Sequence, residues 1–389
     1  MDKEFILGID ASNIRAGGGM THLVELLRSE VHIKKYFSKV IIWSGKATLD
    51  RLHDENWLIK KNPNFLNGNF IKRTFWQKFK LANAARKEHC DIIFVPGGSF
   101  SCNFRPIVTF SQNLLPFQKS ELYRYGISWM TLKMLFLRQV QSSSFRKANG
   151  VIFLNEFAKN IISNEIGINF TNFSIIPHGI NPTFFTPPKE QKDINCYSLN
   201  KPFEILYLSI IDVYKHQCNV ADGVAILRNQ GIPVNIRFVG PAYAPALKKL
   251  LAKIEKLDPK SEFIHYDGKV DHNYLPNILQ KADMFLFASS CENMPNVLLE
   301  GMAAGLPIAC SNLGPMPEVL GNAGIYFNPE DSVNISEVVG KFIVSAELRN
   351  QNAQMSFELA RKYSWDTCAS QTFQFLNFIA RNYNNKSIA

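Results

Sequence analysis

Short apolar runs alternate with polar, helix-like stretches along most of the chain. Each run is rich in Val, Ile and Phe and is followed by turn residues, as buried parallel strands joined by crossover helices require. In the first half the pattern predicts strands at residues 5–10, 40–44, 92–96, 107–110, 151–154 and 174–177. In the second half it predicts strands at 204–209, 234–239, 263–267, 284–288, 308–311 and 325–327. Two such series predict an α/β protein with two doubly wound sheets.

A polar stretch without periodicity separates the two series. It spans roughly residues 177–202 and contains Pro182, Pro187 and Pro188. The 389 residues therefore divide into a first domain over 1–180, a linker over 181–202 and a second domain over 203–364. Two domains of this size imply a cleft between them. An apolar fraction of 46% with 20% charged residues is enough for two cores.

Positive charge is concentrated in the first half. Residues 1–172 contain 24 Lys and Arg against 13 Asp and Glu, a net +11, whereas the remainder has 19 against 20, a net −1. This asymmetry indicates attraction to an anionic partner, although a solvated basic face is the plainer alternative. The first residues predict a strand rather than a signal peptide. No apolar stretch is long enough to span a bilayer. We therefore expect a cytoplasmic protein.

Two segments of the first half mix aromatic, aliphatic and basic residues. They are residues 70–81 (FIKRTFWQKFKL) and residues 123–147, which include Trp129, Phe136 and Lys133. Such mixtures suit the headgroup region of an anionic leaflet, which would make the protein peripheral on the cytoplasmic face of the inner membrane. The alternative is that their apolar faces pack on the first sheet.

Two loops at expected strand ends could bind a phosphate. Gly17, Gly18 and Gly19 directly precede a helical pattern over 22–28, so their backbone could approach an anion at a helix start. Lys215 lies between the strand 204–209 and a helical pattern over 218–228. It could neutralise a departing diphosphate, although by residue type alone an exposed loop lysine is expected.

The strongest local signal is CENMPNVLLEGMAAGLP, residues 291–307. Pro295 suits a first helical turn, and Gly305 followed by Pro307 marks the helix end. Glu292 would then precede the helix and Glu300 would lie about two turns inside it, as a carboxylate acceptor suited to ribose hydroxyls. The amides of Asn293 and Met294 at the helix start would face a phosphate.

With these motifs the sequence resembles the retaining glycosyltransferases of the GT-B architecture, in particular family 4, which includes many bacterial lipopolysaccharide and polysaccharide enzymes. Glu292 to Glu300 matches that family's E-x7-E motif, and Gly301-Met-Ala-Ala-Gly-Leu-Pro matches its continuation. The likeness extends from the glycine loop through Ile176-Pro-His-Gly-Ile, Tyr214-Lys-His and Gly268-Lys-Val to Tyr363-Ser-Trp. It implies two Rossmann-like domains facing across a cleft, with residues 365–389 forming a helix that crosses back to the first domain.

The resemblance also implies roles for matching positions. Lys215 would bind the donor diphosphate, Glu292 the transferred sugar and Glu300 the ribose, while the first domain would bind the acceptor. The residues implied for donor binding are Gly18, Gly19, Lys215, Gly268, Lys269, Val270, Glu292, Asn293, Met294, Pro295 and Glu300, and those implied for catalysis are Glu292, Lys215 and Gln112.

Two positions depart from the family pattern. Ile210 stands where an arginine usually precedes the lysine by five residues, and Gln112 and Asn113 stand where a histidine is common. Neither amide can act as a general base, which is compatible with a donor phosphate that accepts the acceptor's proton. No D-x-D pair occurs, so we expect neither a metal nor another cofactor.

The function expected from these features is transfer of a sugar from a nucleotide-diphosphate sugar to a saccharide or lipid-linked saccharide, in O-antigen, lipopolysaccharide or capsule biosynthesis. The alternatives are a nucleotide-sugar epimerase or phosphorylase of the same fold and a non-catalytic sugar-binding module. Nucleic acid is disfavoured as a partner because no docking motif for it is recognisable.

Overall fold

The computed structural model describes residues 4–388, with side chains described up to residue 385. Residues 1–3 and 389, which the expected domain bounds include, lie outside the described part. The chain forms two compact units. The first contains the chain up to Lys119, Ile127–Gly179 and the segment from Ser364 onward, and the second contains Ser120–Gly126 and Ile180–Tyr363.

The first unit is built on a parallel sheet of order β3-β2-β1-β4-β5-β6-β7. Its strands are β1 (Phe5–Asp10), β2 (Phe37–Trp43), β3 (Leu58–Lys61), β4 (Ile92–Val95), β5 (Ile107–Phe110), β6 (Gly150–Phe153) and β7 (Phe173–Ile175). The six strands expected from the apolar runs are present. The sequence pattern missed β3, because this edge strand ends in two lysines and buries only Leu58 fully.

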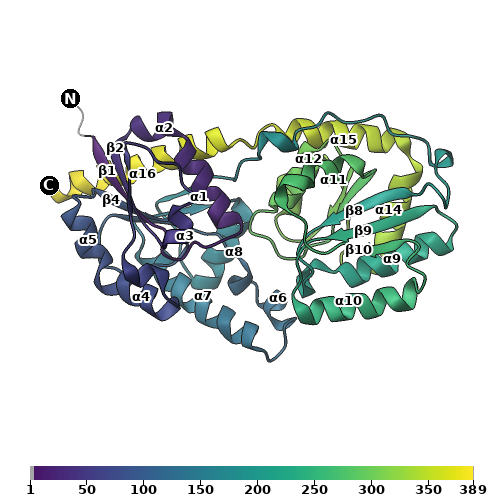
Figure 1. The fold of residues 1–389 in the computed structure, drawn as a ribbon, viewed down its shortest axis with the longest axis horizontal. Coiled ribbons are helices and arrows are strands. Elements are labelled where there is room, and N and C mark those ends of the chain that lie inside the picture. Colours follow the sequence, from purple (N-terminus) through teal and green to yellow (C-terminus); the bar gives the residue numbers. More distant parts are fainter. Residues whose placement is uncertain (1–3, 389) are drawn as a thin grey trace. The chain divides into compact units, whose positions relative to one another are not determined.

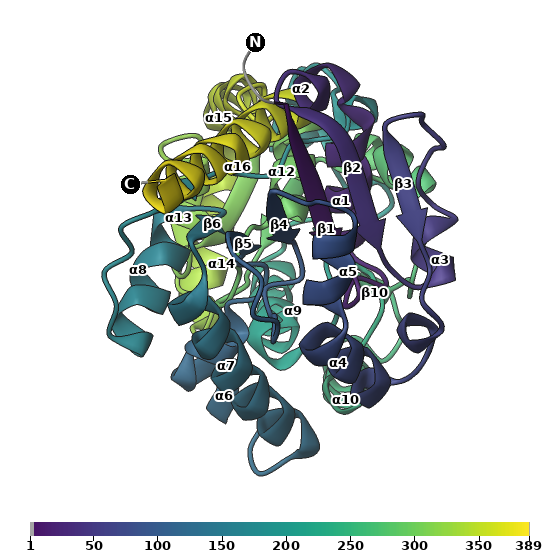
Figure 2. The ribbon, with the colours of Figure 1, turned by 90° about the vertical axis from the view of Figure 1, so that its left-hand side faces the viewer.

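Helices cover both faces of this sheet. They are α1 (Gly18–Arg28), α2 (Glu30–Lys34), α3 (Lys46–Leu49), α4 (Phe70–Phe79), α5 (Leu81–Lys87), α7 (Trp129–Lys147), α8 (Glu156–Ile166) and α16 (Trp365–Ile388), with 3-10 turns η1 (Asn64–Asn67) and η2 (Leu115–Phe117). Helix α16, yellow in Figures 1 and 2, contacts α1, α2 and β4, and its Phe373 packs edge-on against Phe37. The terminal helix is therefore part of the first unit.

The second unit has a parallel sheet of order β10-β9-β8-β11-β12-β13. Its strands are β8 (Phe203–Leu208), β9 (Val234–Val239), β10 (Ile264–Tyr266), β11 (Met284–Phe287), β12 (Ile308–Ser311) and β13 (Ile325–Phe327). All six match the expected runs within a residue or two. The strand order reverses between β8 and β11, and this is the point where doubly wound sheets bind their ligands.

The helices of the second unit connect these strands. They are α9 (Gln217–Asn229), α10 (Ala244–Leu257), α11 (Leu275–Lys281), α12 (Asn296–Ala303), α13 (Met316–Leu320), α14 (Ser332–Val344) and α15 (Ala346–Ala360), with 3-10 turns η3 (Pro182–Phe184), η4 (Ile194–Cys196), η5 (Val213–Lys215) and η6 (His272–Tyr274). Helices α9 and α10 cover one face of the sheet, and α11, α12 and α15 cover the other (Figure 1). In the part of the chain that the structure describes, no helix is both long and apolar enough to cross a membrane.

The expected linker over 181–202 is packed into the second unit rather than free between the units. Arg349 is fully buried and donates to the carbonyl oxygens of Lys192, at 2.5 Å, and of Phe342, at 3.0 Å. Lys189 donates to the Ala282 carbonyl oxygen at 2.6 Å. The prolines do mark a stretch without helix periodicity. A buried guanidinium needs acceptors, however, and this segment supplies two of them to Arg349, the Lys192 carbonyl oxygen and the Gln191 Oε1 atom.

Candidate functional site

Lys215 and Glu292 lie at the carboxyl ends of the two strands where the order reverses. Lys215 ends the 3-10 turn η5 that follows β8, and Glu292 follows β11. The Lys215 ammonium donates a hydrogen bond to the Glu292 carboxylate. The two residues are 77 positions apart in the sequence, and the fold brings them together where a ligand is expected.

This ion pair is buried. The Lys215 side chain is 6% exposed and that of Glu292 is 15% exposed. The Lys215 ammonium also lies 5.1 Å from the ring centre of Tyr214 and 5.0 Å from that of Phe287. The alternative of a solvent-exposed loop lysine is therefore wrong for Lys215. A desolvated cation with one carboxylate partner can attract a second anion more strongly than a surface lysine.

Neighbouring side chains hold the loop that carries Lys215. The Tyr207 hydroxyl donates to the Lys215 carbonyl oxygen at 2.5 Å, and a His216 ring nitrogen lies 2.9 Å from the Ser290 hydroxyl. His216 has a left-handed backbone (φ 52°) and directly precedes α9. Burial, followed by the charge of Arg124, lowers the pKa of His216 to about 4, so its imidazole is neutral at neutral pH.

Glu300 is held inside the E-x7-E helix by a partner that the motif does not reveal. Its side chain is 15% exposed, and its carboxylate lies 3.4 Å from the His272 imidazole. The hydrogen bond to Glu300 raises the pKa of His272 above its usual value, because it favours the charged imidazolium. The Glu300 carboxylate is thus largely withdrawn from solvent.

The helix that carries Glu300 starts later than the sequence suggested. Pro295 precedes the first residue of α12, Asn296, and no side chain caps the helix there. Glu300 consequently lies about one turn into the helix, not two. Asn293 and Met294 are buried just ahead of the helix.

The predicted Gly268-Lys-Val turn follows β10. Gly268 has a left-handed backbone (φ 71°), and its carbonyl oxygen accepts from the Gly240 amide at 2.8 Å. Lys269 is exposed and Val270 is half-buried. Within the described part of the chain, no hydrogen bond or ion pair joins this turn to Lys215 or Glu292, whereas His272, two residues further on, brings the same loop to Glu300.

In the first unit, the glycine loop and Gln112 lie together. Gly17 precedes α1 with a backbone conformation (φ 69°, ψ −160°) suited to glycine, and no side chain caps the helix. A Cβ atom built on Gly19 would come within 2.5 Å of the Gln112 Oε1 atom. The Gln112 Nε2 atom is buried without a hydrogen-bond partner among the described residues. Gln112 therefore has a free donor next to Gly19.

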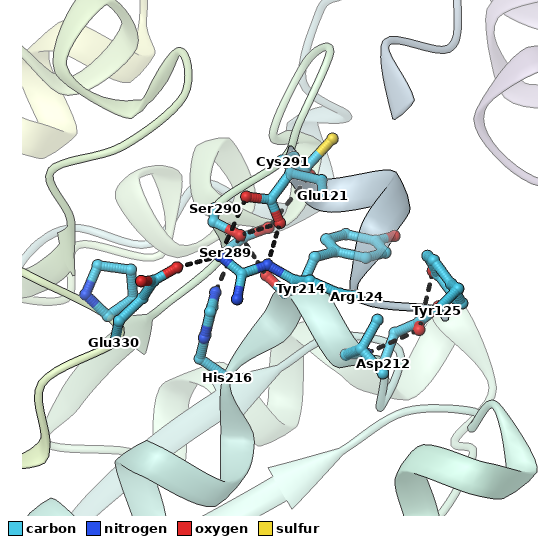
Figure 3. Close-up of polar contacts among 12 residues, drawn as sticks. Glu121, Arg124, Tyr125, Asp212, Tyr214, His216, Ser289, Ser290, Cys291 and Glu330 are labelled. Atoms are coloured by element: carbon cyan, nitrogen blue, oxygen red, sulfur yellow. Dashed lines mark hydrogen bonds and ion pairs between the residues drawn. The ribbon is translucent and has the colours of Figure 1, made fainter. Parts of the chain in front are cut away.

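A segment from the first half of the sequence completes the second unit, and sequence reasoning did not identify it. Glu121, 5% exposed, accepts from the Ser290 hydroxyl at 2.6 Å and from Arg124 Nε at 2.7 Å (Figure 3). Arg124 also pairs with Glu330, and the Tyr125 hydroxyl donates to Asp212 at 2.9 Å. Residues 120–126 thus hold both loops that carry Lys215 and Glu292. No sequence signal identifies these contacts, because they join residues 87 to 206 positions apart.

Among the residues that the structure describes, no group of three or more His, Cys, Asp or Glu side chains is arranged to hold a metal ion. The polar groups gathered at the ends of β8 and β11 include the buried Lys215 ammonium, the Glu292 and Glu300 carboxylates and an uncapped helix start. These groups suit an uncharged polyol linked to a phosphate.

Two family models match the chain in succession. Residues 16–184 match Glycosyltransferase Family 4, and residues 202–343 match Glycosyl transferases group 1. The chain belongs to the family 4, group 1 glycosyltransferases. The family expected from the E-x7-E motif is confirmed.

Two curated relatives of the chain are O-antigen chain mannosyltransferases. The O-antigen chain mannosyltransferase B of Escherichia coli is 32% identical over 28% of this chain and 29% of its own length. The O-antigen chain mannosyltransferase RfbU of Salmonella typhimurium is 22% identical over 51% of this chain and 52% of its own length. The chain thus matches about a third to a half of these relatives' lengths.

Solved structures share the fold over nearly the whole chain. That of Anabaena HepE in complex with UDP and glucose superposes with a TM-score of 0.68 at 16% identity, covering 96% of this glycosyltransferase and 99% of HepE. The expected GT-B fold with two Rossmann-like sheets is confirmed.

Proposed function

We propose that this glycosyltransferase transfers a sugar, with retention of its anomeric configuration, from a nucleotide-diphosphate sugar to a saccharide or lipid-linked saccharide of a surface polysaccharide such as O-antigen. The main support is the buried pair of Lys215 and Glu292 at the point where the strand order reverses, with Glu300 on the helix that follows. The UDP and glucose bound by HepE and the O-antigen relatives support the donor and acceptor classes.

In this proposal the donor diphosphate replaces Glu292 as the partner of Lys215. A diphosphate carries more charge than a carboxylate, so it competes for the buried ammonium when it arrives. The start of α12, which has no side-chain cap, supplies further positive potential. Glu292, released from Lys215, then accepts hydrogen bonds from the sugar hydroxyls, and Glu300 accepts them from the ribose.

The proposed reaction breaks the bond between the anomeric carbon and the phosphate oxygen and forms a bond from the acceptor oxygen on the same face. The acceptor's proton passes to the departing phosphate, because Gln112 can donate a hydrogen bond but cannot take up a proton. Lys215 stabilises the charge that develops on the leaving diphosphate. We propose that this charge stabilisation needs no metal, so that activity persists in EDTA.

The assignment of Glu300 can be tested by ligand binding. A thermal-shift panel of UDP, GDP, ADP and TDP selects the nucleoside diphosphate that stabilises the protein most. Its Kd is then measured by calorimetry for the wild type, for Glu300→Gln and for the exposed control Glu337→Gln. Losing a charged acceptor of the ribose hydroxyls should raise Kd about ten-fold or more in Glu300→Gln and leave the control unchanged. An unchanged Kd in Glu300→Gln would remove Glu300 from the donor site.

The transfer itself is tested with the matching nucleotide sugar and an acceptor extract. We expect nucleoside diphosphate release to require the acceptor, and the product to keep the donor's anomeric configuration by NMR. Release with inorganic phosphate alone, or isomerisation of the donor alone, would favour a phosphorylase or an epimerase instead.

A further inference from the structure

Helices α4 and α7 of the first unit, both labelled in Figure 2, carry large apolar side chains that are exposed to solvent. Ile71 is 74% exposed, Trp129 80%, Leu132 60% and Phe136 58%. Both helices also have an inward face, on which Trp76 and Met134 are buried. The alternative that the apolar side chains of these two segments simply pack on the first sheet therefore accounts for only part of them.

The exposed side chains form one surface, which we call the α4–α7 face and define by Ile71, Phe75, Phe79, Trp129, Leu132 and Phe136. On α4 the rings of Phe75 and Phe79 are 4.9 Å apart. The two helices meet where Phe70 packs edge-on against Phe136, with ring centres 6.3 Å apart. Soluble proteins rarely leave several large apolar side chains exposed side by side without a partner.

The charged residues of α4 and α7 are all basic, and one of them, Arg138, pairs with Glu165 of α8 at 2.5 Å. Neither α4 nor α7 contains an Asp or Glu, whereas together they contain seven Lys and Arg residues. Lys72, Lys78 and Lys133 are exposed and form no ion pair with the described residues. The Lys78 ammonium lies 5.2 Å from the ring centre of Phe79. Aromatic rings and lysines therefore occupy the same surface, without any carboxylate of these helices to neutralise it.

We propose that the α4–α7 face docks on the headgroup region of an anionic phospholipid bilayer, with Ile71, Trp129 and Leu132 inserted and Lys72 and Lys133 on lipid phosphates. A bilayer surface offers apolar depth and negative charge together. A second copy of the chain fits less well, because a two-fold interface would place the lysines of one copy against those of the other. This inference deepens the proposed function by naming the surface on which a lipid-linked acceptor would be met.

Vesicle sedimentation tests the two components of the face separately. The full chain is mixed with vesicles of phosphatidylcholine alone or of phosphatidylcholine with phosphatidylglycerol. We expect binding to the anionic vesicles only. Lys72→Gln with Lys133→Gln should weaken it about 25-fold, at about five-fold per lysine. Ile71→Ser with Trp129→Ser should weaken it about ten-fold or more, because less apolar area inserts. The control Leu251→Ser with Val344→Ser changes exposed apolar residues of the second unit and should have no effect.

Trp129 also provides a local signal. The other four tryptophans, Trp43, Trp57, Trp76 and Trp365, are buried or half-buried. Anionic vesicles should therefore shift the emission of the wild type to shorter wavelength. Trp129→Phe should lose this shift while it still sediments with the vesicles.

Three results would overturn the proposal: no binding of the wild type to anionic vesicles, equal binding of the wild type and both α4–α7 variants, or an emission shift that survives in Trp129→Phe. If gel filtration shows that the face variants dissociate an oligomer while vesicle binding is unchanged, the occupant is a second copy. Nucleoside diphosphate binding is measured on the same variants, because none of the substituted residues belongs to the donor site. Unchanged nucleotide binding together with absent vesicle binding would refute only the membrane proposal and would leave the proposed function intact.

Discussion

The ion pair of Lys215 and Glu292 makes a quantitative prediction about stability. Both side chains are at least 85% buried, so removing one partner leaves an uncompensated charge in the second unit. At an effective dielectric constant of about 20, two charges about 3 Å apart attract by about 5 kcal/mol. A single substitution, Lys215→Met or Glu292→Gln, should accordingly cost about 3–5 kcal/mol. The double variant should cost much less than the sum, because it leaves no unpaired charge, and we expect a coupling energy of about 3 kcal/mol.

Urea unfolding followed by far-UV circular dichroism measures these free energies. All five tryptophans lie in the first unit, so tryptophan fluorescence followed in the same titrations reports on the unit that the substitutions leave unchanged. Met keeps the alkyl contacts of Lys215 with Tyr214 and Phe287, which confines the change to the charge. If the two single losses add up to the double loss within about 0.5 kcal/mol, the pair is not an energetic unit and this reasoning is wrong.

Two further substitutions test the packing and the electrostatics around the site. A Cβ atom on Gly179 would lie 2.1 Å from the backbone nitrogen of Trp365. Gly179→Ala should therefore destabilise the first unit by about 1–3 kcal/mol in fluorescence-detected unfolding. The control Gly97→Ala should not, because its Cβ atom would make only an ordinary van der Waals contact. Burial lowers the pKa of His216 from 6.5 to about 4. Between these pH values the folded state therefore binds fewer protons than the unfolded state. The free energy of unfolding should consequently fall by about 3 kcal/mol as the pH drops from 6.5 to 4. His216→Asn should lose this part of the pH dependence, and equal slopes for wild type and variant would contradict the assignment.

The sequence was sufficient for the elements that bury a continuous apolar run. All six strands of the second sheet were predicted because each is short, apolar and bounded by turn residues. Strand β3 was missed because two of its four residues are lysines, which interrupt the apolar run by which the other strands were recognised. Local periodicity reports burial along one segment, and an edge strand buries too little to produce it.

The candidate site was only partly predictable, for a different reason. The E-x7-E spacing located Glu292 and Glu300, but the burial of Lys215 contradicts the expectation for its residue type. The pairing of Glu300 with His272 and the contacts of Glu121 depend on which loops the fold brings together. Such contacts join residues far apart in the sequence, so no short pattern contains them.

The assignment of residues 120–126 to the second unit has a practical consequence for engineering. The backbone passes from one unit to the other four times, so a single cut near residue 180 does not separate them. A fragment that begins at Ile180 would leave Ser290 and Asp212 without Glu121 and Tyr125. A chimera that exchanges the amino-terminal half to change acceptor preference would remove the same seven residues from the recipient. Such hybrids need this heptapeptide matched to the carboxyl-terminal parent, even though it is encoded within the other half.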